Sequence, residues 1–275
     1  MTAVQAKPQT AASEPILLRE DTDGVTVLTL NRPDISNALS ETMLSALSEG
    51  LAAVASDRGV RAVILAANGS AFCAGHDLKE LTGRRSDPDG GRAFFERVWE
   101  ACGAVMQAIV HLPQPVIAAV QGPATAAGCE LVANCDLAIA STLARFATPG
   151  VNIGLFCSTP MIPLTRNIAR KQAMEMLLTG DMISAEDALR FGLVNRVVAP
   201  NTEQAVAHTF ARKIASKSAT AMQIGKKVFY QQVDMGLADA YRHAARVMVD
   251  NMLKDDANEG IRAFLEKRPA KWKDR

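Results

Sequence analysis

Short apolar runs alternate with stretches of helical periodicity through the first 200 residues of the chain. The runs are rich in Val, Ile, Leu and Ala, which is typical of buried strands. They lie at residues 24–30, 61–67, 115–120, 136–140 and 193–198. Between them, residues 38–54 and 92–111 have the spacing of amphipathic helices. Because strands and helices alternate, the sequence predicts an α/β fold for this part of the chain.

The strand pattern stops after about residue 200, and the rest of the chain is predicted to be helical. The expected helices are amphipathic and lie at residues 202–216, 219–233, 237–252 and 258–267. A helical end of this kind, with apolar stretches such as "ARVMVDNML", suits either a lid or a subunit interface. We therefore divide the chain into a flexible lead-in at residues 1–15, a core at 16–200 and a helical region at 201–275.

Composition narrows the class of protein. The 48% hydrophobic and 21% charged content is that of an ordinary globular protein, and a formal net charge of +1 provides no basic field for nucleic acid. The lead-in lacks the cationic start and apolar core of a signal peptide, and no apolar run approaches the ~20 residues of a membrane span. We expect a cytoplasmic protein whose partners are small molecules or other protein chains.

Cysteine and histidine spacing argues against a metal site. The five cysteines form no CxxC pair, and the four histidines form no HExxH motif. Cysteines within apolar stretches such as "AFCAG" and "AGCEL" are expected to be buried thiols of a protein in a reducing compartment.

The stretch "VQGPATAAGCE", residues 120–130, places a carboxylate among small and apolar residues. A buried strand is expected to end at Val120, a turn follows, and a helix starts near Ala126. The first N–H groups of a helix have no intrahelical partner, and small residues let a ligand approach them. Glu130 projects near the same helix face as Ala127. Glu130 is therefore either a catalytic base or a structural carboxylate paired with a distant Arg or Lys.

A second turn, in "GSAFCAGHDLKEL" at residues 69–81, likewise places small residues directly before an expected helix. Ala74 and Gly75 form a small-residue turn, and a helix is expected to start at His76 and Asp77. Asp77 is predicted to cap this helix, and His76 to act through its backbone rather than its imidazole. Two free N–H groups from the two turns could hold one carbonyl oxygen, as in an oxyanion hole.

The C-terminal "KRPAKWKDR" is predicted to be a solvated tail, with binding of a phosphate-bearing ligand by its cations and Trp272 as the alternative.

Five stretches occur together in one order and spacing, and with them the chain resembles the enoyl-CoA hydratase/isomerase, or crotonase, family from about Ile16 onward. These stretches are "LNRPDISNALS", "ILAANGSAFCAGHDLKEL", "VIAAVQGPATAAGCELVANCDLAIAS", "FATPGVNIGLF" and "ISAEDALRFGLVNRVV". Two of the segments, "AGHDLKELT" and "FATPGVNIGLFCSTP", are especially similar to one subgroup of that family. The resemblance implies a crotonase-like spiral core of repeated ββα turns, with a C-terminal all-helical oligomerisation region that builds trimers, often paired into hexamers.

The resemblance also implies roles for individual residues. The backbone N–H groups of His76 and Ala127 would form the oxyanion hole for an acyl-CoA thioester, and Glu130 matches the first of the family's two catalytic glutamates. No dissociable cofactor is implied, because coenzyme A enters as part of the substrate. The backbone around Asn37, Ala38 and Ala74 would line the coenzyme A path. The full set of expected substrate-binding residues is Asn37, Ala38, Ala74, Gly75, Gly128 and Gly150.

Two departures from the family pattern leave the reaction open. Gly150 stands where hydratases of the family carry their second glutamate, and Ala126 and Ala127 add methyl groups to a helix start that is otherwise glycine-rich. Enoyl-CoA hydratase is our prediction. An isomerase, which needs only one base for a 1,3 proton shift, and a non-catalytic acyl-CoA binding protein are the alternatives.

Overall fold

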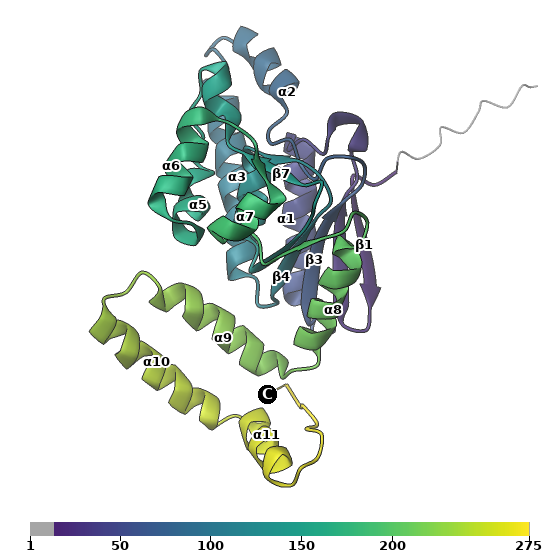
Figure 1. Cartoon of the computed structure of the whole chain (residues 1–275), viewed down its shortest axis with the longest axis vertical. Coiled ribbons are helices and arrows are strands. Elements are labelled where there is room, and N and C mark those ends of the chain that lie inside the picture. The colour runs from purple at the N-terminus through teal and green to yellow at the C-terminus, as the bar shows by residue number, and fades with distance from the viewer. Residues whose placement is uncertain (1–13, 275) are drawn as a thin grey trace, which may run out of the picture.

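The computed structural model describes residues 14–274, as an α/β body followed by a helical arm (Figure 1). The predicted lead-in at residues 1–15 lies almost wholly outside this range.

A six-stranded sheet forms the centre of the body. In spatial order its strands are β1 (Leu17–Thr22), β2 (Val25–Leu30), β3 (Ala62–Ala67), β4 (Val116–Val120), β6 (Leu137–Ser141) and β9 (Arg196–Val198). Only the hairpin β1–β2 is antiparallel, and the remaining neighbours pair in parallel. Every residue of β2, β3 and β4 is buried, as expected for parallel strands that are covered on both faces.

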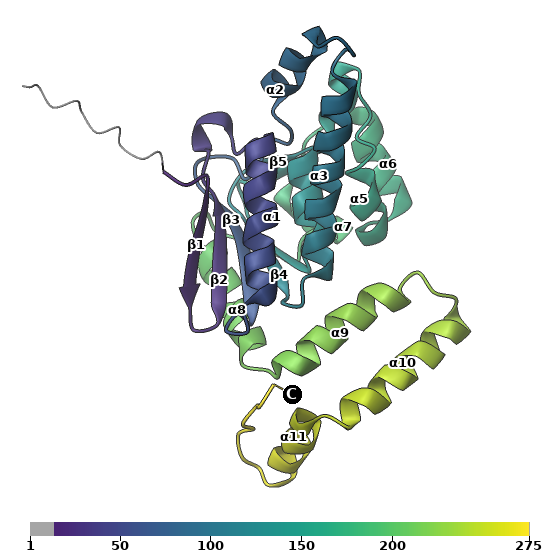
Figure 2. The same ribbon diagram turned by 180° about the vertical axis from the view of Figure 1, so that it is seen from behind.

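Helices cover both faces of this sheet (Figures 1 and 2). The covering helices are α1 (Glu41–Ser56), α3 (Arg92–His111) and α8 (Glu203–Ala215). Alternate side chains of β3 face opposite sides of the sheet. Val63 packs with α1 and α3, whereas Ile64 packs with Ala207 of α8. Ser40 begins α1 by accepting a hydrogen bond from the Met43 N–H.

A second sheet and several short helices form the remainder of the body. The small sheet contains β5 (Ala124–Thr125), β7 (Arg145–Ala147) and β8 (Ile183–Ser184). The short helices are α2 (Leu78–Gly83), α4 (Ala127–Asn134), α5 (Met161–Asn167), α6 (Arg170–Thr179) and α7 (Ala185–Phe191), with 3-10 turns η1 (Pro33–Ile35), η2 (Arg84–Ser86) and η3 (Pro149–Ile153).

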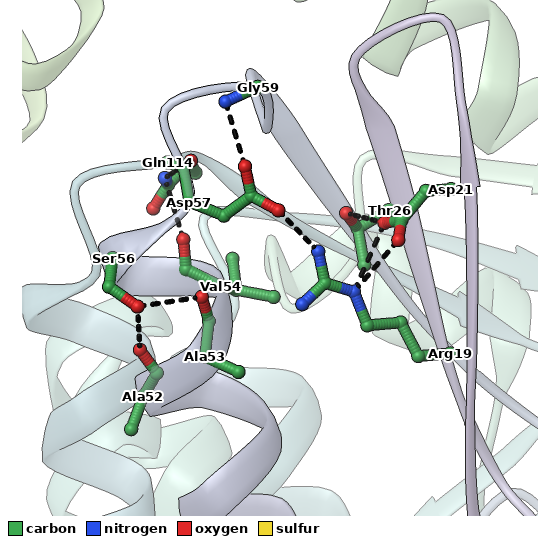
Figure 3. Close-up of polar contacts among 10 residues, drawn as sticks. All are labelled: Arg19, Asp21, Thr26, Ala52, Ala53, Val54, Ser56, Asp57, Gly59 and Gln114. Carbon is green, nitrogen blue, oxygen red and sulfur yellow. Dashed lines mark hydrogen bonds and ion pairs between the residues drawn. The ribbon is translucent and has the colours of Figure 1, made fainter.

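Polar contacts tie the edge hairpin to the end of α1 (Figure 3). The Arg19 guanidinium pairs with Asp21 at 3.0 Å and with Asp57 at 2.7 Å, so one side chain joins β1 to the residue after α1. Asp57 also accepts a hydrogen bond from the Gly59 N–H, and Arg19 and Gly59 together hold the pKa of Asp57 below its usual range. These contacts fix the turn that leads into β3.

The C-terminal arm consists of three helices that project away from the body (Figure 2). They are α9 (Ala219–Gln232), α10 (Leu237–Met252) and α11 (Asp255–Leu265). Large apolar side chains are exposed along the arm, including Phe229, Leu237, Tyr241, Val249, Leu253 and Phe264. No helix in residues 14–274 is both long and apolar enough to cross a membrane.

The last residues fold back onto the arm, so the tail is ordered by internal contacts, although most of its residues are exposed as predicted. Arg268 forms a two-pronged ion pair with Glu259, at 2.7 and 3.0 Å. The Trp272 indole donates to the Ser216 carbonyl at 2.8 Å, and the Lys273 N–H donates to buried Asp256. The indole and the arginine are thereby committed to internal contacts rather than to a phosphate-bearing ligand.

A buried lysine anchors α9 to the body. The Lys226 ammonium pairs with Asp136 at 2.7 Å and donates to the carbonyls of Ile109 and Gln114, while its side chain is only 6% exposed. The Tyr230 hydroxyl donates to the other Asp136 oxygen at 3.0 Å. One helix face thus docks on the end of α3 and the start of β6.

We expect Lys226→Met to lower the free energy of unfolding by about 3–5 kcal/mol, because it leaves the Asp136 carboxylate without its cation. Urea denaturation followed by circular dichroism measures this loss. Lys227→Met, one position along and exposed, is the matched control and should change stability little. Equal effects of the two substitutions would contradict the anchoring role of Lys226.

Candidate active site

A cavity of about 580 Å³ opens where the two small-residue turns meet the segment after β7. Four of the predicted residues line it through the turns or their neighbours, namely Ala38, Ala74, His76 and Ala127, and Gly150 lines it from the opposite segment. Much of the remaining wall is apolar, with contributions from Leu81, Trp99, Leu155 and Phe156. The cavity therefore suits a ligand with an apolar portion.

The two turns present unpaired backbone donors next to each other. A methyl group placed on Gly75 would lie 3.2 Å from the Ala127 nitrogen, which shows how closely the turns approach. Within residues 14–274, neither the His76 N–H nor the Ala127 N–H donates to another group of the protein. On either side of His76 the backbone bonds to Leu39, because the Gly75 carbonyl accepts from the Leu39 N–H and the Asp77 N–H donates to the Leu39 carbonyl.

Local contacts hold this arrangement in place. Asp77 caps α2 as predicted, accepting from the N–H groups of Lys79 and Glu80. The Thr125 N–H donates to the Cys73 carbonyl, and the Thr125 hydroxyl donates to the Ala74 carbonyl. The donors are therefore fixed before any ligand arrives.

Ala126 carries backbone strain at the start of α4. Its φ of 51° and ψ of −120° lie in a region that only glycine adopts easily. The Ala126 N–H donates to the Ala147 carbonyl, a bond that helps to hold this conformation. Such strain persists where the surroundings demand it, and here it turns the Ala127 N–H outward at the helix start.

Glu130 is buried and has no cationic partner within the described chain. It is 3% exposed, and the Thr159 hydroxyl donates to its Oε2 at 3.0 Å. Burial raises the pKa of Glu130 to about 7, and the Thr159 hydrogen bond opposes the rise. The alternative of a structural carboxylate paired with Arg or Lys is therefore wrong. A carboxyl with this pKa can both accept and return a proton near neutral pH.

His76 lines the cavity, and neither nitrogen of its imidazole has a hydrogen-bond partner in the described part of the chain. Its ring stacks at 5.1 Å from the Trp99 ring, and burial lowers its pKa, which favours the neutral form at pH 7. The unbonded backbone N–H of His76 is compatible with the predicted backbone role, which stays a prediction.

Gly150 lies in a crowded position. A methyl group there would approach the Cys157 sulfur at 2.9 Å and the Leu155 carbonyl oxygen at 3.0 Å. The Gly150 N–H also donates to that sulfur at 3.3 Å. The segment after η3 thus folds tightly against residue 150, and as it stands it leaves no room for a side chain.

Three of the predicted substrate-binding residues, Asn37, Gly75 and Gly128, do not line the cavity. The Asn37 side chain is buried and bonds to the backbone of Arg32, Asn68 and Ala71, so it braces the loops rather than the ligand path. Gly75 and Gly128 serve the close approach of the turns. Thr159, which donates to Glu130 from 29 positions along the chain, was not predicted, because no local pattern places it beside that carboxylate.

Residues 14–274 contain no cluster of three or more His, Cys, Asp or Glu side chains that could hold a metal ion. All five cysteines are free and buried, as predicted.

Comparison with known proteins identifies the family. Residues 20–275 match the model of the enoyl-CoA hydratase/isomerase family. The chain is 45% identical to mitochondrial enoyl-CoA hydratase domain-containing protein 3 of Rattus norvegicus over 97% of its own length and 88% of the relative's, and 46% identical to that of Homo sapiens over 91% and 81%. This is the subgroup to which the two segments quoted above are similar.

Solved structures agree. An enoyl-CoA hydratase from Mycobacterium smegmatis is 52% identical, with a TM-score of 0.90 over 94% of this chain and 99% of that one. Human enoyl-CoA hydratase domain-containing protein 3 superposes with a TM-score of 0.89 at 44% identity, over 94% of this chain and 100% of that one. The α/β body therefore has the crotonase fold, and the chain belongs to the enoyl-CoA hydratase/isomerase family.

Proposed function

We propose that the protein is an enoyl-CoA hydratase that acts on a 2-enoyl-CoA thioester with one glutamate. The observation that carries the proposal is one cavity with two unpaired N–H groups, from His76 and Ala127, and with Thr159, whose hydroxyl bonds to the buried Glu130 carboxyl of pKa about 7. The N–H pair suits a thioester oxygen, and Glu130 suits proton transfer at the neighbouring carbons.

Hydration then follows a balanced sequence. The Glu130 carboxylate takes a proton from water as the water oxygen bonds to C3 of the substrate. The electron pair of the C2=C3 bond moves toward the thioester, and the resulting enolate oxygen is held by the His76 and Ala127 N–H groups. As the enolate collapses, the protonated Glu130 delivers its proton to C2. Water is added across the double bond, and the carboxylate is restored.

A double-bond isomerase is the second candidate, and the crowding at Gly150 favours it. Because glycine at this position supplies no second carboxylate, the reaction would use Glu130 as its base. It would remove a proton from C2 of a 3-enoyl-CoA and return it to C4, while the same N–H pair holds the dienolate oxygen.

The substrate and assembly complete the proposal. The apolar side chains around the cavity, such as Leu81 and Phe156, would pack on the acyl chain, and coenzyme A would enter as part of the substrate, without a separate cofactor. The exposed apolar side chains of α9 to α11 support a homotrimer or homohexamer. Five buried free thiols support a reducing compartment, and we propose the cytoplasm.

The test supplies the purified protein with a short trans-2-enoyl-CoA and, separately, a trans-3-enoyl-CoA, and follows the absorbance of the conjugated thioester. Loss of absorbance with the first substrate supports the hydratase. A gain with the second substrate alone supports the isomerase instead. No change with either, together with tight acyl-CoA binding in calorimetry, would overturn both reactions for these substrates and favour a binding protein.

A further inference from the structure

The Glu130 carboxylate has one hydrogen-bond partner in the described chain, and that partner comes from a distant segment. The Thr159 hydroxyl donates to Oε2 at 3.0 Å, across 29 positions of sequence. No side chain or backbone group within residues 14–274 donates to Oε1. The two oxygens of the carboxyl group are therefore not equivalent.

The segment that carries Thr159 is itself well held. The Thr159 carbonyl accepts a hydrogen bond from the Ile162 N–H at 3.0 Å, and the Cys157 carbonyl accepts one from the Met161 N–H at 3.1 Å. Buried Pro160 follows directly and precedes α5. A hydroxyl on a backbone fixed in this way can hold a carboxylate in one orientation.

We propose that Thr159 is the positioning residue of the active site: by holding Oε2 of Glu130, it leaves Oε1 as the oxygen that exchanges protons with water or substrate. This inference rests on the proposed function of Glu130 as the acid–base group. Thr159 also lines the cavity in which the acyl group is expected to bind.

The other titratable groups around Glu130 leave this hydrogen bond as its main polar support. Cys102 of α3, Cys129 of α4 and Cys157 are thiols whose pKa values burial raises, with the nearby Glu130 charge adding to the rise, so they stay neutral at pH 7. The cationic side chain of α5 is Arg166. It is exposed, and its guanidinium donates to the Ile162 carbonyl. Burial disfavours the ionised form of Glu130, and the hydrogen bond from Thr159 favours it.

Thr159→Val keeps the shape of the side chain and removes its donor. We expect kcat to fall about ten- to hundredfold, as for the loss of a hydrogen bond to a charged group, with a smaller change in KM. The acid limb of the pH–rate profile should move to higher pH, because the carboxylate loses the donor that favours it. Thr159→Ser keeps the hydroxyl and should restore both the rate and the position of that limb.

Two controls separate this role from a general effect on folding. Thr165→Val makes the same change in α5, at an exposed hydroxyl that donates to the Met161 carbonyl, and should leave kcat and the pH profile unchanged. Thermal unfolding of each variant tests whether the fold persists. A Thr159→Val enzyme with an unchanged acid limb would overturn the inference, even when its rate falls.

An infrared titration of the Glu130 carboxyl decides the inference without turnover. The protonated carboxyl band is followed with pH and assigned by its loss in Glu130→Gln. A midpoint that moves upward in Thr159→Val, but not in Thr159→Ser or Thr165→Val, supports the positioning role. An unmoved midpoint overturns it. Absence of turnover in the unmodified protein would instead overturn the proposed function, and the two failures are thus distinguishable.

Discussion

Glu130→Gln should reduce turnover by about 10²–10⁴-fold while leaving acyl-CoA affinity nearly unchanged. The amide keeps the size of the side chain and can still accept the Thr159 hydrogen bond, but it cannot take or return a proton. Stopped-flow or steady-state assays that follow the absorbance of the conjugated thioester give the rate, and calorimetry gives the affinity for acyl-CoA. The unmodified enzyme should gain activity as pH rises through about 7, where Glu130 ionises.

The same substitution should increase stability at high pH. Because burial raises the folded-state pKa of Glu130 to about 7 from 4.5, the carboxyl is neutral in both states below pH 4.5 and costs nothing there. Between pH 4.5 and about 7, Glu130 ionises in the unfolded chain but stays neutral in the folded chain, so the folded state loses stability as pH rises. Above pH 7 the cost is complete, on the order of 2–3 kcal/mol.

Urea denaturation at pH 5 and pH 8 tests this sign. We expect Glu130→Gln to exceed the unmodified protein in stability mainly at pH 8. Glu186→Gln, at an exposed position of α7, is the matched control and should change neither rate nor stability. A Glu130→Gln variant that retains full turnover would contradict the acid–base role.

The parts of the fold that follow from local pattern were predicted well. The helix over residues 92–111 and the helix over residues 237–252 begin and end as expected, because long amphipathic periodicity is a strong signal. The edge strand β1 was missed, since "LLREDT" is largely exposed and held mainly by its pairing with β2. The helices α5 to α7 were also missed, because each is short and has few buried positions.

The internal contacts of the C-terminal tail were missed for a different reason. A run such as "KRPAKWKDR" resembles a solvated end, and only tertiary contacts with Glu259, Asp256 and Ser216 fold it back. The partner of Glu130 was equally hidden from the sequence, because Thr159 is brought to it by the path of η3 and α5. By contrast, the two turns were predictable, since small-residue turns before helices expose N–H groups by local geometry. The resemblance to the family then identified His76 and Ala127 as the donors.

Gly128→Ala should damage both stability and turnover, since it separates the two donor turns. A methyl group on Gly128 would lie 2.1 Å from the Cys73 carbonyl oxygen and 2.7 Å from its carbon. Because these are backbone atoms, no side-chain rotation relieves the clash, and the turns themselves must move apart. Overpacking of this kind typically costs about 1–3 kcal/mol of stability.

The rate should fall further than the stability loss explains. Gly128 follows the Ala127 donor, and Cys73 lies three positions before the His76 donor, so the movement misplaces the donor pair directly. Losing one well-placed oxyanion donor costs about 10²–10³ in kcat. Gly225→Ala is the matched control, because a methyl group there meets nothing within 4 Å, and alanine in the α9 helix should stabilise the protein slightly.

Assays well below the melting temperature of each variant distinguish lost catalysis from lost fold. Should Gly128→Ala be destabilised yet keep its kcat, the two turns would be a structural contact and not an oxyanion hole. A fall in kcat with affinity for a saturated acyl-CoA largely retained would mean that the spacing of the donors acts chiefly on the charged transition state. That outcome follows from the geometry, because a neutral thioester oxygen gains far less from two aligned N–H groups than an enolate oxygen does.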